Sequence, residues 1–176
     1  MWSQKDWYEK GRSPETDLAN SVKQVVDLRR SLDVLLAQPG IEPHRIAYVG
    51  HDFGAMYGAV LSGVDARVRW YVLMAGNPSF EKWYTYSAKP KDAAAFSAQM
   101  ASIDPAAFLS VSKAEAFLFQ FADTDPYVSS GEALAFASAA PLPRGVFWYR
   151  AKHSLNVPEA FSDRIAWLDE RLNPAP

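Results

Sequence analysis

An aspartate occupies the apex of a short turn in the first third of the chain. Asp52 is the central residue of Gly50-His51-Asp52-Phe53-Gly54, which follows an apolar run and precedes a helix-prone run. Small residues flank such a turn when it joins a strand to a helix and presents its central side chain above a sheet. In a dry pocket a carboxylate there can attack carbon and form an ester intermediate. Asp52 is thus the predicted nucleophile, the alternative being a structural acid that hydrogen-bonds the turn amides.

The three histidines differ in their positions relative to the apolar runs. His153 follows the last run, so it lies beyond the carboxyl end of a strand, where groups from other loops can meet it. His44 precedes its run, at the opposite end of the sheet, and is predicted to be a surface residue. His51 flanks the nucleophile, where we expect it to pack beside the pocket or to hydrogen-bond there. His153 is therefore the candidate base for the water that attacks an ester on Asp52.

The elements that must position these groups alternate along the chain. Four runs rich in aromatic and β-branched residues predict strands buried on both faces, at residues 45–50, 68–76, 114–122 and 144–151. Helix-prone segments lie between or after them, at 55–61, 131–139 and 158–172, and a longer helix is expected from 13 to about 38. This order predicts an α/β fold with a parallel sheet of about four strands flanked by helices.

The composition narrows the class of protein and its partners. The length of 176 residues favours one domain over 1–176, and 49% hydrophobic with 22% charged residues is an ordinary globular mixture. The 18 basic and 20 acidic residues are scattered, so we expect no nucleic acid partner, and no apolar run is long enough to span a membrane. The absence of cysteine is compatible with a cytoplasmic protein, and neither a metal cluster nor a nucleotide loop predicts a cofactor.

Three blocks occur in the order nucleophile, acid, histidine: YVGHDFGAMYGA, FLFQFADTDPYVS and VFWYRAKHSLN. On these blocks the chain, from about residue 15 onward, resembles the α/β-hydrolase superfamily, in particular its dienelactone-hydrolase and esterase-like members. The resemblance implies that Asp125 orients His153, with Asp123 as the second choice for the acid. Lys152 stands where the family usually has glycine. The function implied is hydrolysis of a small ester-type substrate.

The same residues are compatible with other functions. The family's epoxide hydrolases and haloalkane or haloacid dehalogenases use an aspartate at this turn to form an alkyl ester. Phe53 stands where many of those enzymes have Trp or Arg, and its side chain offers no donor to a halide. Attack by Asp52 on a carboxylic ester would give an anhydride, so serine suits that reaction better. An alternative from another functional class is a non-catalytic binding or interaction protein that retains the fold.

A longer excursion, residues 77–113, separates the second and third strands and predicts a lid-like insertion or substrate wall. Trp83, Tyr84 and Tyr86, together with His51, are the predicted substrate-binding residues. The alternative for the two tyrosines is packing within the excursion.

The resemblance also implies strands and an oxyanion loop upstream of the long helix, which we expect this chain to lack. The N–H of Phe53 then remains as one oxyanion donor. A sheet that starts at residues 45–50 exposes a strand edge, and we expect a homodimer that covers it, or else a truncated and weakly active protein.

Overall fold

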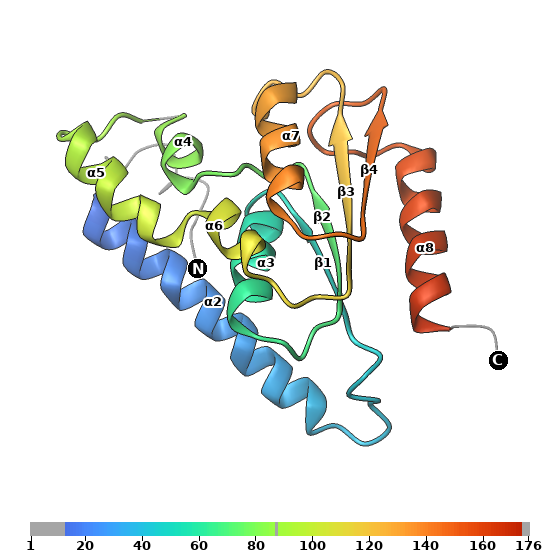
Figure 1. Ribbon diagram of the computed structural model, residues 1–176. Helices are drawn as coiled ribbons and strands as arrows, with labels where there is room; N and C mark the ends of the chain where they lie inside the picture. The colour runs from blue at the N-terminus through green and yellow to red at the C-terminus, as the bar shows by residue number, and fades with distance from the viewer. Residues whose placement is uncertain (1–12, 87, 174–176) are drawn as a thin grey trace.

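The alternating strand and helix pattern produces a layered α/β structure. The computed structural model describes residues 13–86 and 88–173, and its four strands form one parallel sheet in the order β1-β2-β3-β4 (Figure 1). The strands are β1 (Ala47–His51), β2 (Trp70–Met74), β3 (Ala116–Ala122) and β4 (Arg144–Tyr149). The helices are α2 (Pro14–Leu36), α3 (Phe53–Val64), α4 (Phe80–Thr85), α5 (Ala93–Met100), the 3₁₀ helix η1 (Ala101–Ile103), α6 (Pro105–Ser110), α7 (Ser130–Ala139) and α8 (Pro158–Leu172). The predicted fold class is confirmed.

The two central strands and the two outer strands differ in burial. Every residue of β2 and β3 is buried, as predicted for strands between two helical layers. The same prediction was wrong for the outer strands, because Val49 of β1 is 46% exposed and Phe147 of β4 is 40% exposed. Each outer strand pairs on only one side within the described residues. The homodimer expected over the edge at residues 45–50 stays a prediction.

Helices cover both faces of the sheet. Figure 1 shows α8 on one side and α2, α3, α6 and α7 on the other. Beneath α8, the buried amide Nε2 of Gln120 donates to the hydroxyl of Tyr149 and to the carbonyl of Ala160, both at 2.8 Å. The Tyr149 hydroxyl in turn donates to Asp163 at 2.9 Å. These bonds fix α8 on the sheet and so hold the loop between β4 and α8.

The excursion of residues 77–113 packs mainly against the helical layer. Its helix α5 contacts α2, and α6 contacts α3. The α6 contact is close: a Cβ on Gly63 of α3 would lie 2.6 Å from the carbonyl oxygen of Phe108. Helix α4 reaches the carboxyl ends of the strands, where it places Trp83 beside His153. None of the helices that the structure describes combines the length and hydrophobicity needed to cross a membrane.

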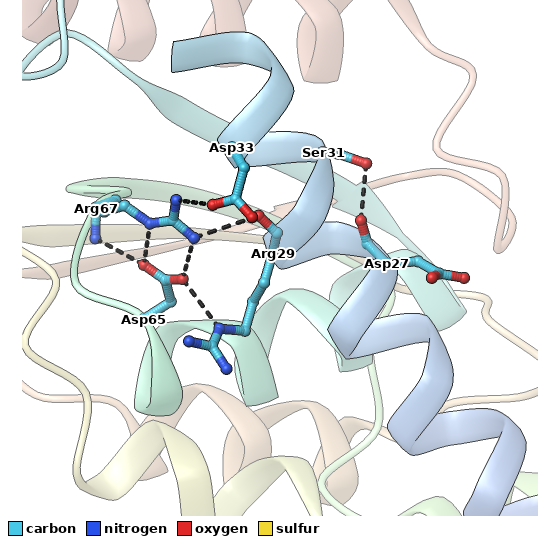
Figure 2. A network of polar contacts seen from close by, with 6 residues as sticks. All are labelled: Asp27, Arg29, Ser31, Asp33, Asp65 and Arg67. Carbon is cyan, nitrogen blue, oxygen red and sulfur yellow. Dashed lines mark hydrogen bonds and ion pairs between the residues drawn. The ribbon is translucent and has the colours of Figure 1, made fainter. Parts of the chain in front are cut away.

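A cluster of charged residues attaches α2 to the loop between α3 and β2 (Figure 2). Asp65, whose side chain is 5% exposed, accepts two hydrogen bonds from the Arg67 guanidinium, at 2.8 and 2.6 Å, and one from Arg29 at 3.1 Å. Arg67 also donates to Asp33 on α2. The Arg67 hydrogen bonds outweigh the effect of burial and lower the pKa of Asp65 to about 2. The long helix is thus attached by a buried carboxylate in addition to its apolar stripe.

We expect Asp65→Asn to destabilise the fold and to weaken its acid dependence. The carboxylate has a lower pKa in the folded chain than the ordinary value near 4, so it stabilises the fold above about pH 4, and this contribution is lost as the pH falls toward 2. The free energy of unfolding at neutral pH should fall by about 1–3 kcal/mol in urea denaturation. Asp27→Asn, which removes an exposed acid of α2 outside this cluster, is the control. An unchanged acid slope in Asp65→Asn would contradict the assignment.

Candidate active site

Asp52 lies in a strained turn between β1 and α3. Its backbone angles are φ 60° and ψ −122°, a conformation that a residue with a side chain adopts only when its surroundings impose it. The backbone N–H of Asp52 donates to the carbonyl of Met74 at the end of β2, at 2.9 Å. The N–H of Phe53, the first residue of α3, donates to Oδ1 of Asp52. The carboxylate is therefore held by its own turn, and its second oxygen, Oδ2, faces His153.

The close approach of β1 and α3 explains the glycines around this turn. A Cβ on Gly50 would lie 2.4 Å from the carbonyl oxygen of Gly54, and a Cβ on Gly58 would lie 2.3 Å from the ring of Tyr48. The Tyr48 hydroxyl donates to the same Gly54 carbonyl at 2.7 Å. These contacts leave no room for a side chain at Gly50 or Gly58. Gly54 itself has space, since its nearest neighbour would be 3.9 Å away.

The three predicted catalytic residues come together at the carboxyl ends of the strands. Nδ1 of His153 donates to Oδ2 of Asp125 at 2.8 Å, and Nε2 lies 3.4 Å from Oδ2 of Asp52. The imidazole thus lies between two carboxylates. Asp123, the second choice, instead accepts a hydrogen bond from the N–H of Ala151 at 3.2 Å.

The loop after β3 directs Asp125 toward the imidazole. Oδ1 of Asp125 accepts hydrogen bonds from the N–H groups of Tyr127 and Val128, at 2.8 and 3.2 Å, which leaves Oδ2 for His153. The Asp125 side chain is only 2% exposed, whereas that of Asp52 is 35% exposed. One carboxylate is therefore enclosed, and the other is open to a small molecule.

The two carboxylates determine the charge of the imidazole. Burial by itself would lower the pKa of His153, but the hydrogen bonds and charges of Asp125 and Asp52 raise it to about 9. For Asp125 the effects are reversed. Burial by itself would raise its pKa, but the hydrogen bonds from His153 and from the Tyr127 amide leave the pKa below its usual range. At neutral pH the site therefore holds a protonated imidazole between two carboxylates.

Aromatic rings and a second histidine surround His153. Its ring stacks on Trp83, with centroids 5.6 Å apart, and meets the edge of Tyr127 at 5.0 Å. Nε2 of His51 donates to the carbonyl of His153 at 2.7 Å, and the two imidazoles meet edge to face at 4.9 Å. Trp83 also contacts the ring of Phe53, at 6.0 Å. His51, Phe53 and Trp83 thus lie at the site for which they were predicted.

The two tyrosines predicted to bind substrate lie elsewhere. Tyr84 is fully buried, and its hydroxyl is hydrogen-bonded to Ser21 of α2 at 2.8 Å and to Tyr57 of α3 at 3.3 Å. This position favours the packing alternative for Tyr84. Tyr86 is 60% exposed, and its ring contacts that of Tyr127 at 5.1 Å. Tyr127 was missed as a site residue, although it follows the predicted acid by two positions.

One group of side chains at the site has the composition of a metal-binding cluster. His51, Asp52 and His153 each offer a ligand atom, and these atoms lie within 4.8 Å of one another. The sequence indicated no such cluster, because His51 and Asp52 are adjacent whereas His153 follows a different strand.

Comparisons with solved structures agree with this architecture. An acetyl xylan esterase from Paenibacillus sp. R4 superposes with a TM-score of 0.73 and 16% identity, over 84% of this chain and 52% of that chain. A zinc-bound cold-adapted esterase from an Arctic intertidal metagenomic library superposes with a TM-score of 0.65 and 18% identity, over 87% of this chain and 60% of that chain. Dipeptidyl peptidase 4 of Porphyromonas gingivalis superposes with a TM-score of 0.68 and 14% identity, over 86% of this chain and 22% of that chain. No family model and no curated protein matches the sequence.

The chain therefore has a partial α/β-hydrolase-like fold, and the structures it resembles include esterases and peptidases. It spans about half the length of the acetyl xylan esterase, or 52% of that chain. The identities are low, so the likeness concerns the fold. Within that fold, the turn at Asp52 and the loops bearing Asp125 and His153 make up the candidate active site.

We expect Gly50→Ala to destabilise the protein, because the added methyl group would overlap the backbone of Gly54. The free energy of unfolding should fall by about 1–3 kcal/mol or more, measured by urea denaturation. Gly131→Ala is the matched control, since a Cβ there meets nothing within 4 Å and Ala suits helix α7 better than Gly. Equal stabilities of the two variants would refute the close contact.

The protonation of His153 can be measured directly in metal-free protein. Imidazole chemical shifts in NMR should titrate near pH 9, with Asp125→Asn lowering this pKa and His153→Ala assigning the signal. Because the pKa is higher in the folded chain, its contribution to stability is complete below about pH 6.5 and is lost as the pH rises through 9. Asp123→Asn, which keeps an acceptor for Ala151, is the control and should leave the titration unchanged. A titration near pH 6.5 in the wild type would disprove the bridging position.

Proposed function

We propose that this protein is a hydrolase in which Asp52 forms a covalent ester with a small substrate and His153, oriented by Asp125, activates the water that hydrolyses it. The observation that carries this proposal is the row of three side chains with the imidazole of His153 at its centre. Oδ2 of Asp52 lies 3.4 Å from Nε2 of this ring, and Oδ2 of Asp125 lies 2.8 Å from Nδ1. A nucleophile, a base and a group that orients the base are the requirements for covalent catalysis.

In the first step, Oδ2 of Asp52 attacks a substrate carbon. A bond forms between this oxygen and the carbon, and the bond from the carbon to its leaving group breaks, so that the leaving group departs with the electron pair. Oδ1 keeps its hydrogen bond from the Phe53 N–H and becomes the carbonyl oxygen of the new ester. The open position of the Asp52 side chain, 35% exposed, is compatible with the approach of a substrate.

In the second step, water attacks the carbonyl carbon of this ester. His153 takes a proton from the water, negative charge develops on Oδ1, and the ester bond then breaks to release an alcohol and restore the carboxylate. The N–H of Phe53 already points at Oδ1, so it stabilises the charge that develops there. The amide predicted from the sequence as an oxyanion donor thus acts on the nucleophile's own oxygen.

The charge on Asp52 explains how His153 changes its role. In the resting site two carboxylates keep the imidazole protonated, so it cannot accept a proton. Ester formation removes the charge of Asp52, and this withdraws one of the two contributions that raise the pKa of His153. The imidazole can then lose its proton and act as a base. Covalent ester formation therefore generates the base for the second step.

The carboxylate chemistry favours a substrate with a leaving group on a saturated carbon, such as an epoxide or a haloalkane. Attack there gives a stable alkyl ester on Asp52, whereas attack on a carboxylic ester gives a reactive anhydride. The rings of Trp83 and Tyr127, which enclose His153, suit an apolar substrate.

A small ester of the dienelactone or acetyl type is the second candidate substrate. It is favoured by the esterases among the structures that share the fold. With an ester, Asp52 would attack the acyl carbon and release the alcohol first. The two candidates differ in the product of the first step, an alkyl ester or an anhydride, and so can be separated by trapping it.

Heavy-oxygen labelling tests the covalent step. Excess enzyme is reacted once with styrene oxide, a bromoalkane, a haloacid or 4-nitrophenyl acetate in H₂¹⁸O, and the Asp52 peptide is examined by mass spectrometry. With the epoxide, the bromoalkane and the haloacid, we expect the label in the carboxylate of Asp52 and not in the alcohol released in this first turnover, because the new hydroxyl oxygen of that alcohol comes from the enzyme. With 4-nitrophenyl acetate, 4-nitrophenol leaves in the first step with its own oxygen, and water that attacks the Asp52 carbonyl of the anhydride places the label in Asp52. Asp52→Ala should lose activity by about 10³-fold or more, while Asp123→Asn should keep it.

Other labelling results would contradict the proposal. Label in the product with none in Asp52 would show that water attacks the substrate directly. If none of the four substrate classes is turned over and Asp52→Ala binds them as the wild type does, the results would favour a non-catalytic binding protein.

A further inference from the structure

We propose that His51, Asp52 and His153 form a binding site for a divalent transition-metal ion of the zinc type. The three residues come from the end of β1, the turn that follows it and the loop after β4. Each offers a ligand atom, and the three atoms lie within 4.8 Å of one another. Two imidazoles and one carboxylate are a ligand set that zinc uses when a fourth position is left open.

The distances require only small movements of the side chains. Ligand atoms around a tetrahedral ion, each about 2.0–2.1 Å from the metal, lie roughly 3.4 Å from one another. The Oδ2 atom of Asp52 and the Nε2 atom of His153 are already 3.4 Å apart. The ligand atom of His51 lies within 4.8 Å of both, so a small movement brings it to a similar spacing. The carboxylate and one imidazole are thus spaced for a shared ion.

Each ligand already has the supporting hydrogen bond that metal ligands require. Asp125 accepts a hydrogen bond from Nδ1 of His153, so Nε2 of His153 is left for the ion. The carbonyl of His153 accepts a hydrogen bond from Nε2 of His51, so the lone pair on Nδ1 of His51 is left for the ion. The N–H of Phe53 holds Oδ1 of Asp52, which leaves Oδ2. Such partners set the tautomer and the ring orientation, and their loss typically costs about 10–100-fold in metal affinity.

The charges and the access also suit a cation. Asp52 and Asp125 supply two negative charges, and in the part of the chain that the structure describes neither forms an ion pair with lysine or arginine. A divalent ion in place of the imidazole proton would balance them. Two nitrogen donors among three ligands select zinc over magnesium or calcium, which prefer oxygen. The exposed side of Asp52 leaves space for water as a fourth ligand.

Zinc titration of the chelator-treated, full-length protein tests this site without any substrate. Calorimetry and the metal content after gel filtration should show one zinc ion per chain near neutral pH, while Mg²⁺ gives no binding. We expect Asp125→Asn to weaken binding by about 10–100-fold, and His51→Ala to weaken it more because a ligand is lost. His44→Ala is the matched control: this exposed histidine precedes β1 and should bind no ion, so its loss should change nothing.

The absence of bound zinc in the wild type would overturn the proposal, as would equal zinc affinity in the wild type and His51→Ala. Loss of binding in His44→Ala would also overturn it, because the ion would then lie at the surface. Thermal unfolding of each metal-free variant shows whether it is folded, and the absorption spectrum of the Co²⁺-loaded wild type reports on a tetrahedral site.

A bound ion also has a consequence for catalysis, and this part rests on the proposed function. Zinc on Oδ2 of Asp52 and Nε2 of His153 would occupy both the nucleophile and the base, so it should inhibit the hydrolase. The metal site and the hydrolase function can be disproved independently of each other. Zinc binding without any turnover would support the metal site and oppose the hydrolase, whereas turnover without zinc binding would do the reverse.

Discussion

The sharp turn between β1 and α3 is the constraint on which the candidate site depends. The strand must reverse into the helix at Asp52, and the helix then lies so close to the strand that Gly50 has no space for a side chain. The same geometry gives Asp52 a positive φ angle and directs the Phe53 N–H at its carboxylate. The strain is held by surrounding packing and by the bond to the carbonyl of Met74, so the Asp52 carboxylate has a fixed position at the candidate site.

The row of carboxylate, imidazole and carboxylate makes this site electrostatically different from one with serine at the turn. A neutral serine would leave His153 facing one carboxylate, whereas here two carboxylates bind the same ring and raise its pKa to about 9. The site therefore stabilises a positive charge at its centre in the resting state. Both the proposed change in role of the imidazole and the proposed affinity for a zinc-type ion rest on this one feature.

Much of the fold was predictable from local patterns, because strand and helix formation follow the spacing of apolar residues and the caps. Helix α8 has the predicted bounds of 158–172, and α2 begins at Pro14, one residue after the predicted start at 13. Burial of the outer strands was not predictable, since an apolar run looks the same at the centre and at the edge of a sheet. Val49 and Phe147 are exposed because no element among the described residues covers them.

For the candidate site, the sequence by itself indicated the turn at Asp52 and the histidine His153, since a glycine-flanked acid and a residue after the last strand are visible in the chain order. It also determined that the acid would follow β3. Only the tertiary structure decided between Asp123 and Asp125, because the hydrogen bonds of the loop amides set which side chain points at His153. Packing likewise buried Tyr84 and brought His51 into contact with His153, since the direction of a side chain depends on neighbours distant in sequence.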